Sequence, residues 1–345
     1  MFMKKVSVVI LNWNGIGMLK KFLPAVVECS KGEGVEVCVA DNGSTDESVE
    51  WLKANWPDVR LVILDRNYGF AEGYNQSLQQ VNAEYVVLLN SDVEVTPHWL
   101  EPLVEYMDAH PEVAACQPKL RAECNKAYFE YAGAAGGYID KFGYPFCRGR
   151  LFEVLEKDQG QYDTVTPIFW ATGAALLVRL KDYQEVGGLD GRFFAHMEEI
   201  DLCWRLRSRG RGIVCIPQSM VYHVGAATLK KENPHKTFLN FRNNLLMLYK
   251  NLSEKELKRV LFVRGVLDWL AALVFLLKGD GKNAKAVVQA RKEFKRILPD
   301  FEVSRFENLK KTIVDDIPEK VDFSILWKFH IGKKKTFSSL RTMDF

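Results

Sequence analysis

Three polar side chains, Asn90, Asp92 and Glu94, occupy alternate positions directly after the apolar run YVVLL. They admit three interpretations. Asp and Asn are frequent in turns after strands. Oxygen ligands of this type also bind Mg²⁺ or Mn²⁺, usually together with substrate phosphates. An acidic partner of a phosphate-binding P-loop is the third, but the sequence contains no GxxxxGK[ST] motif. The turn and the metal site both remain open on this cluster alone.

Two further groups could take part in the same chemistry. The segment MEEIDLCWR places Glu198, Glu199 and Asp201 together. Such acids either complement a helix N-terminus or supply a general base whose pKa is raised by its neighbours. His223 follows a β-rich run in VYHVG, where a neutral imidazole can bind a metal or contact a phosphate. An ordinary core or surface histidine is the alternative.

The elements that must position these residues alternate between strand and helix. Four β-rich runs, VSVVILNW, VEVCVADN, VRLVILD and EYVVLLN, are separated by helical segments. This βαβαβαβα order predicts an α/β fold with a mostly parallel sheet and helices on both faces. We expect Ser44 or Thr45 to cap the second helix, with Asp46 and Glu47 in its first turn. We expect Pro97 near the first turn of the fourth helix.

Every predicted strand ends in polar residues. The four ends are Asn12-Trp13-Asn14, Asp41-Asn42, Asp65-Arg66-Asn67 and Asn90-Ser91-Asp92. Ligands of open parallel sheets bind outside the carboxyl ends of the strands, so these ends predict the binding site. Residues 120–165 are irregular and rich in Gly and aromatic residues, which indicates a loop or antiparallel segment beside the substrate. A helix from Glu198, a strand up to His223 and further helices from about residue 238 follow.

The charge of the chain is unevenly distributed. Residues 241–345 carry 22 Lys and Arg against 13 Asp and Glu, a net of +9, whereas residues 1–240 have a net of −6. A basic tail fits either a solvated helical surface or an anionic membrane leaflet. Seven cysteines without framework spacing favour a reducing compartment. The first apolar run reads as a strand and not a signal peptide, and we expect a cytoplasmic protein.

One segment of the tail, Val260–Leu277, approaches membrane-spanning length. Arg264 and Asp268 share one face of this helix, and a span would place both charges in lipid. A helix that packs on the protein body or lies in a membrane interface is the better prediction. In the second case the protein is peripheral on the inner face of the cytoplasmic membrane.

Six motifs in order extend the argument to a family. VSVVILNWNG, VADNGSTDES, NYGFAEGYNQS, LLNSDVEV, WATGAALLVR and EEIDLCWRLRSRG…VYHVG resemble those of the bacterial family 2 glycosyltransferases, in the rhamnosyltransferase-like branch. The resemblance covers about Val6 to Leu248. It implies a GT-A domain over residues 1–240, with a nucleotide-sugar half (1–118) and an acceptor and catalytic half (119–240). Residues 241–345 would form a basic, mainly helical extension.

The resemblance also implies roles for individual residues. Asp92 would bind Mg²⁺ or Mn²⁺ with His223, and Glu199 or Glu198 would be the catalytic base. Residues matching the nucleotide-sugar contacts are Asn12, Trp13, Asn14, Asp41, Asn42, Asn67, Gly69, Gly73, Asn75, Asn90 and Ser91. Residues matching the strip near the donor sugar and acceptor are Trp170, Thr172 and Gly173, with Asp201 beside the base. Two positions depart from the family pattern: Asn90 replaces the first carboxylate of the DxD motif, and Glu199 stands where Asp is usual.

The implied reaction transfers a sugar, with inversion, from a nucleoside-diphosphate sugar such as dTDP-rhamnose. The acceptor would be a glycan or lipid-linked glycan in surface polysaccharide synthesis, and nucleic acid is not an expected partner. A nucleotidyltransferase is a second hypothesis, but it would need a Gly-rich basic loop after the first strand, and NWNGIGMLKK fits that poorly. A sugar-nucleotide or glycan-binding module with a degenerate site is a third, given some support by Asn90.

Overall fold

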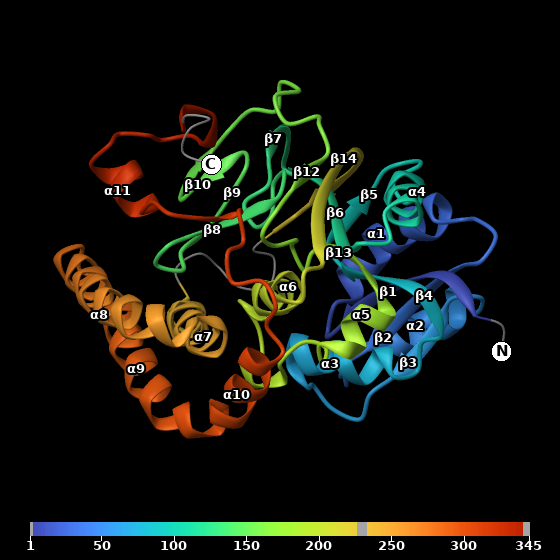
Figure 1. The fold of residues 1–345 in the computed structure, drawn as a ribbon. Coiled ribbons are helices and arrows are strands. Elements are labelled where there is room, and N and C mark those ends of the chain that lie inside the picture. Colours follow the sequence, from blue (N-terminus) through green and yellow to red (C-terminus); the bar gives the residue numbers. More distant parts are fainter. Residues whose placement is uncertain (1–2, 226–232, 341–345) are drawn as a thin grey trace.

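The first part of the fold is the predicted parallel sheet. The computed structural model describes residues 3–225 and 233–340. Its first four long strands lie in the order β3-β2-β1-β4 and are parallel throughout (Figure 1). The elements are β1 (Lys4–Asn12), α1 (Ile16–Cys29), β2 (Val35–Asp41), α2 (Ser48–Asn55), β3 (Arg60–Ile63), α3 (Gly69–Leu78) and β4 (Ala83–Asn90). The carboxyl ends of these strands therefore meet at one edge.

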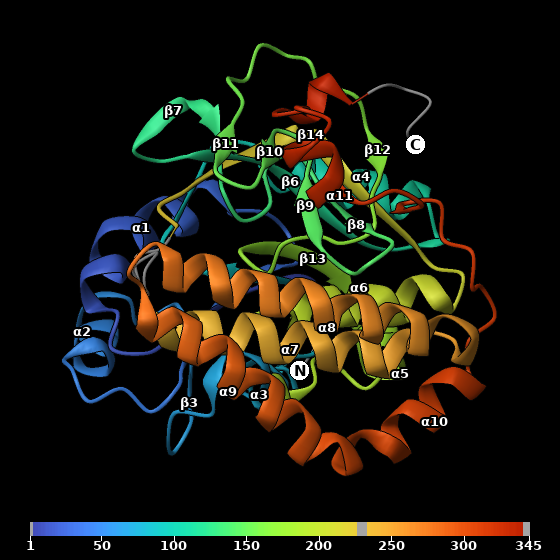
Figure 2. The same cartoon turned by 90° about the vertical axis from the view of Figure 1, so that its left-hand side faces the viewer.

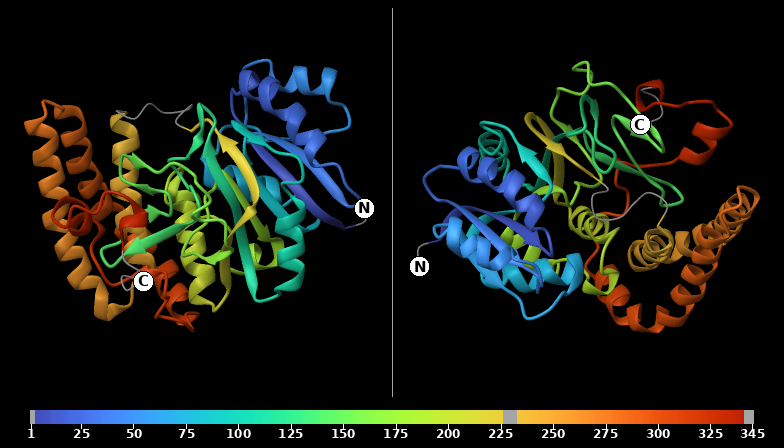
Figure 3. Two further views of the ribbon diagram at one scale, coloured as in Figure 1. Left: turned by 90° about the horizontal axis from the view of Figure 1, so that it is seen from above. Right: turned by 180° about the vertical axis from the view of Figure 1, so that it is seen from behind.

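The sheet continues beyond β4 in a mixed arrangement. The order is β4-β13-β6-β14-β12, in which β13 is antiparallel to both of its neighbours and β14 is parallel to β6. These elements are β5 (Val93–Val95), β6 (Val113–Ala122), β12 (Thr166–Pro167), β13 (Ala175–Arg179) and β14 (Gly212–His223), with α4 (Glu101–Ala109), α5 (Leu180–Glu185) and α6 (Glu198–Ser208). The predicted α/β fold with helices on both faces of a central sheet is confirmed (Figure 3), and the parallel part of the sheet is β3-β2-β1-β4.

The alternation of side chains along β1 explains why the sheet is covered on both faces. Val9 belongs to one buried apolar cluster, whereas Val8 and Ile10 belong to another. All three side chains are buried. A continuous β-branched run suits such a strand, because both of its faces leave water.

Two helix boundaries were predicted wrongly. Helix α2 begins at Ser48, with Glu47 as its N-cap, and not at the Ser44 or Thr45 cap. The Ser44 hydroxyl instead accepts a hydrogen bond from the backbone of Asn14, so loop contacts outcompete the cap. Helix α4 begins at Glu101 with Pro102 in its first turn, so Pro97 precedes the helix.

The irregular segment after β6 forms a second, smaller sheet. It contains β8 (Gly137–Asp140), β9 (Pro145–Cys147), β10 (Arg150–Leu151) and β11 (Val154–Leu155), after β7 (Asn125–Phe129), which pairs with β6. The fifth strand, β15 (Lys320–Val321), comes from the C-terminal tail and pairs with β8. The tail therefore completes a sheet of the proposed acceptor half.

The remaining chain is helical. The helices are α7 (Pro234–Asn251), α8 (Glu254–Leu277), α9 (Gly281–Ile297), α10 (Glu302–Lys310) and α11 (Ile325–His330). Figure 2 shows α8 lying lengthwise across α7 and beside α9. One helix among the described residues, α8, is long and apolar enough to cross a membrane by length and composition. Arg264 and Asp268 on α8 are buried, and Asp268 pairs with Arg291 of α9 at 2.6 Å.

Candidate functional site

The ends of β1 and β2 are joined by a buried polar network. The Asn12 side chain donates to the Asp41 carboxylate at 3.0 Å and to the Ser44 hydroxyl at 3.2 Å. Asn14, in the left-handed region at φ 49°, accepts hydrogen bonds from the backbones of Thr45 and Asp46. Asp41 and Asn12 are almost fully buried. The predicted nucleotide contacts at these two strand ends therefore lie together.

A second network adds the segment before α3. The Asn42 amide donates to the Asn67 side chain at 3.1 Å and to the Gly69 carbonyl at 2.9 Å. A Cβ atom at Gly73 would lie 2.9 Å from the Asn42 amide nitrogen, so only glycine lets α3 approach this closely. Trp13 stands beside these groups in sequence, and half of its side chain is exposed.

The cluster after β4 converges with the end of β14. Asp92 Oδ1 lies 3.1 Å from His223 Nε2, and the Asn90 amide lies 3.5 Å from the same nitrogen. The other imidazole nitrogen, Nδ1, lies 3.2 Å from Glu130 Oε1. Asp92, Glu130 and His223 are all buried. Glu94 is separate, because it pairs with Lys126 at 2.6 Å.

Two carboxylates on one imidazole determine its protonation. Burial lowers the pKa of His223, but Glu130 and Asp92 outweigh it and raise the pKa to about 10. At neutral pH the ring is therefore a cation, with Nε2 at hydrogen-bonding distance from Asp92 and Nδ1 in an ion pair with Glu130. A cation at Asp92 would replace the proton on Nε2, while Glu130 would keep the Nδ1–H oriented, as a carboxylate commonly does for a metal-bound histidine.

The ligand set fits a cation shared with a substrate. Among residues 3–225 and 233–340, no group of three or more His, Cys, Asp or Glu side chains could hold a metal ion. Asp92 and His223 present one oxygen and one nitrogen to a common space. A Mg²⁺-type site usually takes one or two protein carboxylates and completes its coordination with water and phosphate oxygens.

A short segment before β13 connects this cluster to the predicted base. The Asn90 backbone donates to the Ala174 carbonyl at 3.0 Å. A Cβ atom at Gly173 would lie 3.7 Å from the Glu199 Cβ and 3.2 Å from the Phe70 ring. The structure thus brings Asn90 and Glu199 against two adjacent residues, Ala174 and Gly173.

Glu198 and Glu199 occupy the first turn of α6. Glu198 is buried, and Glu199 is partly exposed. Burial, with Glu199 and Asp201 nearby, raises the pKa of Glu198 well above its ordinary value. Burial raises the pKa of Glu199 to about 7. In each carboxylate one oxygen, Oε2, has no hydrogen-bond partner among the described residues. Such an oxygen is expected where a bound ligand donates a hydrogen bond to the carboxylate.

The loop that enters α6 is strained and is held by α7. Phe194, His196 and Met197 all have positive φ, at 66°, 71° and 73°, a conformation that costs non-glycine residues energy and clusters at functional sites. The Asn243 side-chain amide lies 2.8–2.9 Å from the carbonyl oxygens of Phe193, Ala195 and His196. Asn243 is fully buried. The C-terminal helix α7 therefore fixes the backbone that carries the two acids.

We expect Asn243→Ala to lower the turnover number roughly tenfold to a hundredfold, because a small displacement of a reacting group is costly. The KM for the sugar nucleotide should stay near the wild-type value, since Asn243 contacts the loop of the acids and not the strand ends. Steady-state kinetics would measure both. Asn240→Ala is the matched control, because Asn240 also lies on α7 but bonds only within it; equal losses in both variants would contradict the positioning role.

Four of the residues singled out in the sequence are engaged within the protein. Asn75 bonds Tyr183 and the backbone of Leu189. Asp201 is fully buried and pairs with Arg205 and Lys250. Trp170 donates to the Tyr138 carbonyl, and the Thr172 backbone donates to Gln117. These contacts position the segments around the site, and the roles expected from the resemblance remain predictions.

Sequence reasoning missed three residues of the site. Glu130 lies in the irregular segment, Gln117 lies inside a buried strand, and Asn243 lies on a helix of the tail. Asn243 was detectable in principle, because a polar residue on the apolar side of a helix needs a partner. Glu130 carried no local signal.

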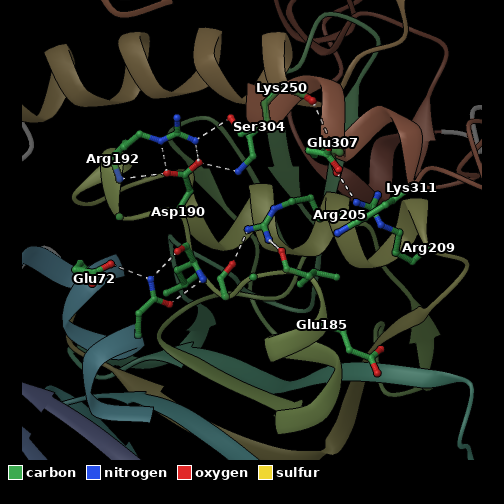
Figure 4. Close-up of a pocket in the computed structure, with 17 residues that line it drawn as sticks. Glu72, Glu185, Asp190, Arg192, Arg205, Arg209, Lys250, Ser304, Glu307 and Lys311 are labelled. Atoms are coloured by element: carbon green, nitrogen blue, oxygen red, sulfur yellow. Dashed lines mark hydrogen bonds and ion pairs between the residues drawn. The ribbon is translucent and has the colours of Figure 1, made fainter. Parts of the chain in front are cut away.

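A polar cavity of about 410 Å³ lies between α3, residues 185–192, α6, α7 and α10, with Asn75 in its lining (Figure 4). Its cations are largely neutralised. Arg192 and Lys250 pair with Asp190 at 2.6 and 2.8 Å, and Arg205 pairs with Asp201 at 2.9 Å. We therefore interpret this cavity as a structural junction between α3, α6, α7 and α10.

Comparison with known proteins agrees with the geometry. The family model "Glycosyl transferase family 2" matches residues 7–172. The N-acetylglucosaminyl-diphospho-decaprenol L-rhamnosyltransferase of Mycobacterium tuberculosis is 27% identical over 59% of this chain and 71% of its own length. Rhamnosyltransferase WbbL of Escherichia coli is 24% identical over 55% of this chain and 72% of its own.

A solved structure agrees in fold. The mannosyltransferase PcManGT of Pyrobaculum calidifontis, in complex with GDP-Man and Mn²⁺, has a TM-score of 0.52 and 14% sequence identity. The match covers 90% of this chain and 85% of that one. The chain has a GT-A-type fold, and its residues 7–172 are similar to the family 2 glycosyltransferases, with relatives that are named as rhamnosyltransferases.

Proposed function

We propose that this enzyme transfers a sugar, with inversion at the anomeric carbon, from a nucleoside-diphosphate sugar to a hydroxyl group of a glycan or lipid-linked glycan, with Mg²⁺ or Mn²⁺ as cofactor. The observation that carries the proposal is one contact set. Asn90, beside Asp92 and His223, and Glu199 pack on two adjacent residues, Ala174 and Gly173. A leaving-group site and a base would then meet at one donor sugar.

Each part of the site has a chemical role. The network of Asn12, Asp41 and Asn42 would bind the nucleoside, and the exposed Trp13 ring offers a stacking surface. Asp92 and His223 would hold the cation, which stabilises negative charge on the diphosphate leaving group. Glu199 would accept the proton of the acceptor hydroxyl as that oxygen attacks. A single displacement requires no nucleophilic side chain and inverts the anomeric centre.

The proposed substrates are supported by the names of the two relatives. These names support rhamnose as the transferred sugar, and dTDP-rhamnose is the donor that we propose. The mycobacterial relative is named for a diphospho-decaprenol acceptor, which supports a lipid-linked acceptor here. We place the enzyme in the cytoplasm, in peripheral contact with the inner face of the membrane through residues 241–345.

The test is incubation of the full-length protein with a panel of sugar nucleotides, with and without Mn²⁺. We expect slow, Mn²⁺-dependent release of nucleoside diphosphate from one donor, and that donor should raise the melting temperature. Release of pyrophosphate would indicate a nucleotidyltransferase instead. A thermal shift without any turnover, even with acceptor glycans present, would indicate a binding module. Absence of both binding and release with every donor would refute the proposal.

A further inference from the structure

Helix α8 buries its charged side and exposes its apolar side. Its buried side carries Arg264 and Asp268, which bond each other and neighbouring helices. Its exposed side is apolar, with seven large side chains that are half or more exposed: Phe262, Val266, Trp269, Leu270, Leu273, Leu276 and Leu277. Their spacing of three, four or one residues places them on one helical face. An exposed apolar stripe of this size marks an interaction surface.

Cations flank the stripe at both ends. Lys255, Lys258 and Arg259 are exposed in the first two turns of α8, at helical spacing from Phe262. Lys278 and Lys282 are exposed where α8 leads into α9. The outward face of α9 continues the charge with Lys285, Lys292 and Lys295. Apolar side chains between cations are the pattern of helices that lie in the surface of an anionic bilayer.

A second element on the same side of the molecule has the same character. Helix α11 lies on the side that carries α8, as Figures 1 and 2 show. Its Trp327 and Ile331 are 65% and 61% exposed. Lys333 follows directly and is also exposed. Tryptophan is enriched at membrane–water interfaces, so α11 offers a second, separate apolar site on the same side of the molecule as α8.

We infer that the exposed face of α8, with α11 on the same side of the molecule, binds flat on an anionic lipid bilayer. A span is disfavoured, because Arg264 donates to Asn244 of α7 and Asp268 pairs with Arg291 of α9, which ties α8 side-on to both helices. A second copy of the chain is a poorer occupant. If two α8 helices packed about a twofold axis, parallel or antiparallel, a cationic end of one helix would lie against a cationic end of the other. These like charges would repel each other.

The docking face is physically connected to the catalytic half. Arg264 bonds Asn244 and the Phe142 carbonyl, and Asn244 donates to the Gly143 carbonyl at 2.7 Å. The next residue on α7, Asn243, holds the loop that enters α6. This inference rests on the proposed function in one respect: a lipid-linked acceptor gives the enzyme a reason to lie on the bilayer. A bilayer-bound α8 would then hold the acceptor half at the surface where that acceptor resides.

Vesicle sedimentation of the full-length protein tests the inference. We expect binding to phosphatidylglycerol/phosphatidylcholine vesicles at least about tenfold stronger than to phosphatidylcholine alone, weakening with salt. Trp269→Ser with Leu273→Ser should reduce binding to anionic vesicles at least about tenfold. The matched control is Ile313→Ser, whose side chain is 76% exposed but follows α10, where its backbone bonds Ser208.

Three outcomes would overturn the inference: wild-type binding by the double variant, equal loss in the control, or no vesicle binding by the wild type. A wild-type dimer that the double variant converts to a monomer, without vesicle binding, would assign the face to a second copy. Donor hydrolysis in solution separates this test from the proposed function. It should be unchanged in the double variant, and vesicle binding without any turnover would refute the function while leaving the docking face in place.

Discussion

Glu199→Gln is expected to lower the rate of sugar transfer by about 10²–10⁴-fold, the usual contribution of a general base. The amide keeps the shape of the side chain but cannot accept the proton of the acceptor hydroxyl. The melting temperature should not fall, because a carboxylate with a strongly raised pKa is not stabilising as an anion. Initial rates with saturating donor and acceptor, with circular dichroism for the fold, would measure both effects.

Glu198→Gln is the matched comparison. Glu198 is buried, and burial with Glu199 and Asp201 nearby raises its pKa well above the ordinary value, whereas Glu199 is partly exposed. Of two neighbouring carboxyl groups, the more deeply buried one is expected to stay protonated. Glutamine should therefore mimic the protonated Glu198 and retain most activity. Glu199→Asp should also retain part of it, since Asp is the usual residue in the family. Loss in Glu198→Gln with retention in Glu199→Gln would reverse the assignment.

The same assignment fixes a pH dependence. The base must be ionised, and burial raises the pKa of Glu199 to about 7. We therefore expect kcat/KM to rise about tenfold per pH unit below this value and to level off above it. The profile should be measured at fixed Mn²⁺ and in Glu199→Asp as well. If kcat/KM of Glu199→Asp fell to half of its plateau at the same acidic pH as the wild type, Glu199 would not be the titrating group.

The strand ends could be predicted from sequence because the relevant physics is local. A buried β-rich run followed by Asn or Asp marks a strand end, and parallel strands must end at one edge. Asn12, Asp41, Asn42 and Asn67 accordingly share hydrogen bonds or lie side by side in the structure. The helix caps were less predictable, because Ser44 had two competing partners. Its bond to the Asn14 backbone prevailed over helix capping.

The residues that hold the site residues in position could not be predicted, because they come from distant parts of the chain. Glu130 becomes a partner of His223 only when β7 and β14 both pair with β6. Asn243 becomes a partner of the Phe194–His196 loop only when α7 packs on α6. Neither contact leaves a periodic or spacing signal. Residues 241–345 looked separable in sequence, yet β15 pairs with β8 and α7 packs on α6.

Asp92→Ala is expected to have an effect as large as that of Glu199→Gln, but on a different step. Without the carboxylate, the cation proposed to bind here would lose its oxygen ligand, and we expect donor turnover to fall by about 10³-fold. The Mn²⁺-dependent rise in melting temperature with donor should disappear, which is a readout independent of activity. If the variant kept that rise, the cation would have to bind elsewhere.

Glu130→Gln separates the metal interpretation from a purely structural one. The glutamine carbonyl can still accept the Nδ1–H of His223, so the ring should keep its orientation, but the negative charge behind it is lost. Outer partners of this kind typically contribute 10–100-fold to metal affinity. We therefore expect the Mn²⁺ concentration for half-maximal turnover to rise by about that factor, with near wild-type turnover at saturating Mn²⁺. Gln also removes a negative charge that raises the pKa of His223. A proton would then compete less with Mn²⁺ for the imidazole, which opposes the loss of metal affinity. A lowered Mn²⁺ requirement would mean that proton competition, and not ligand basicity, governs the site.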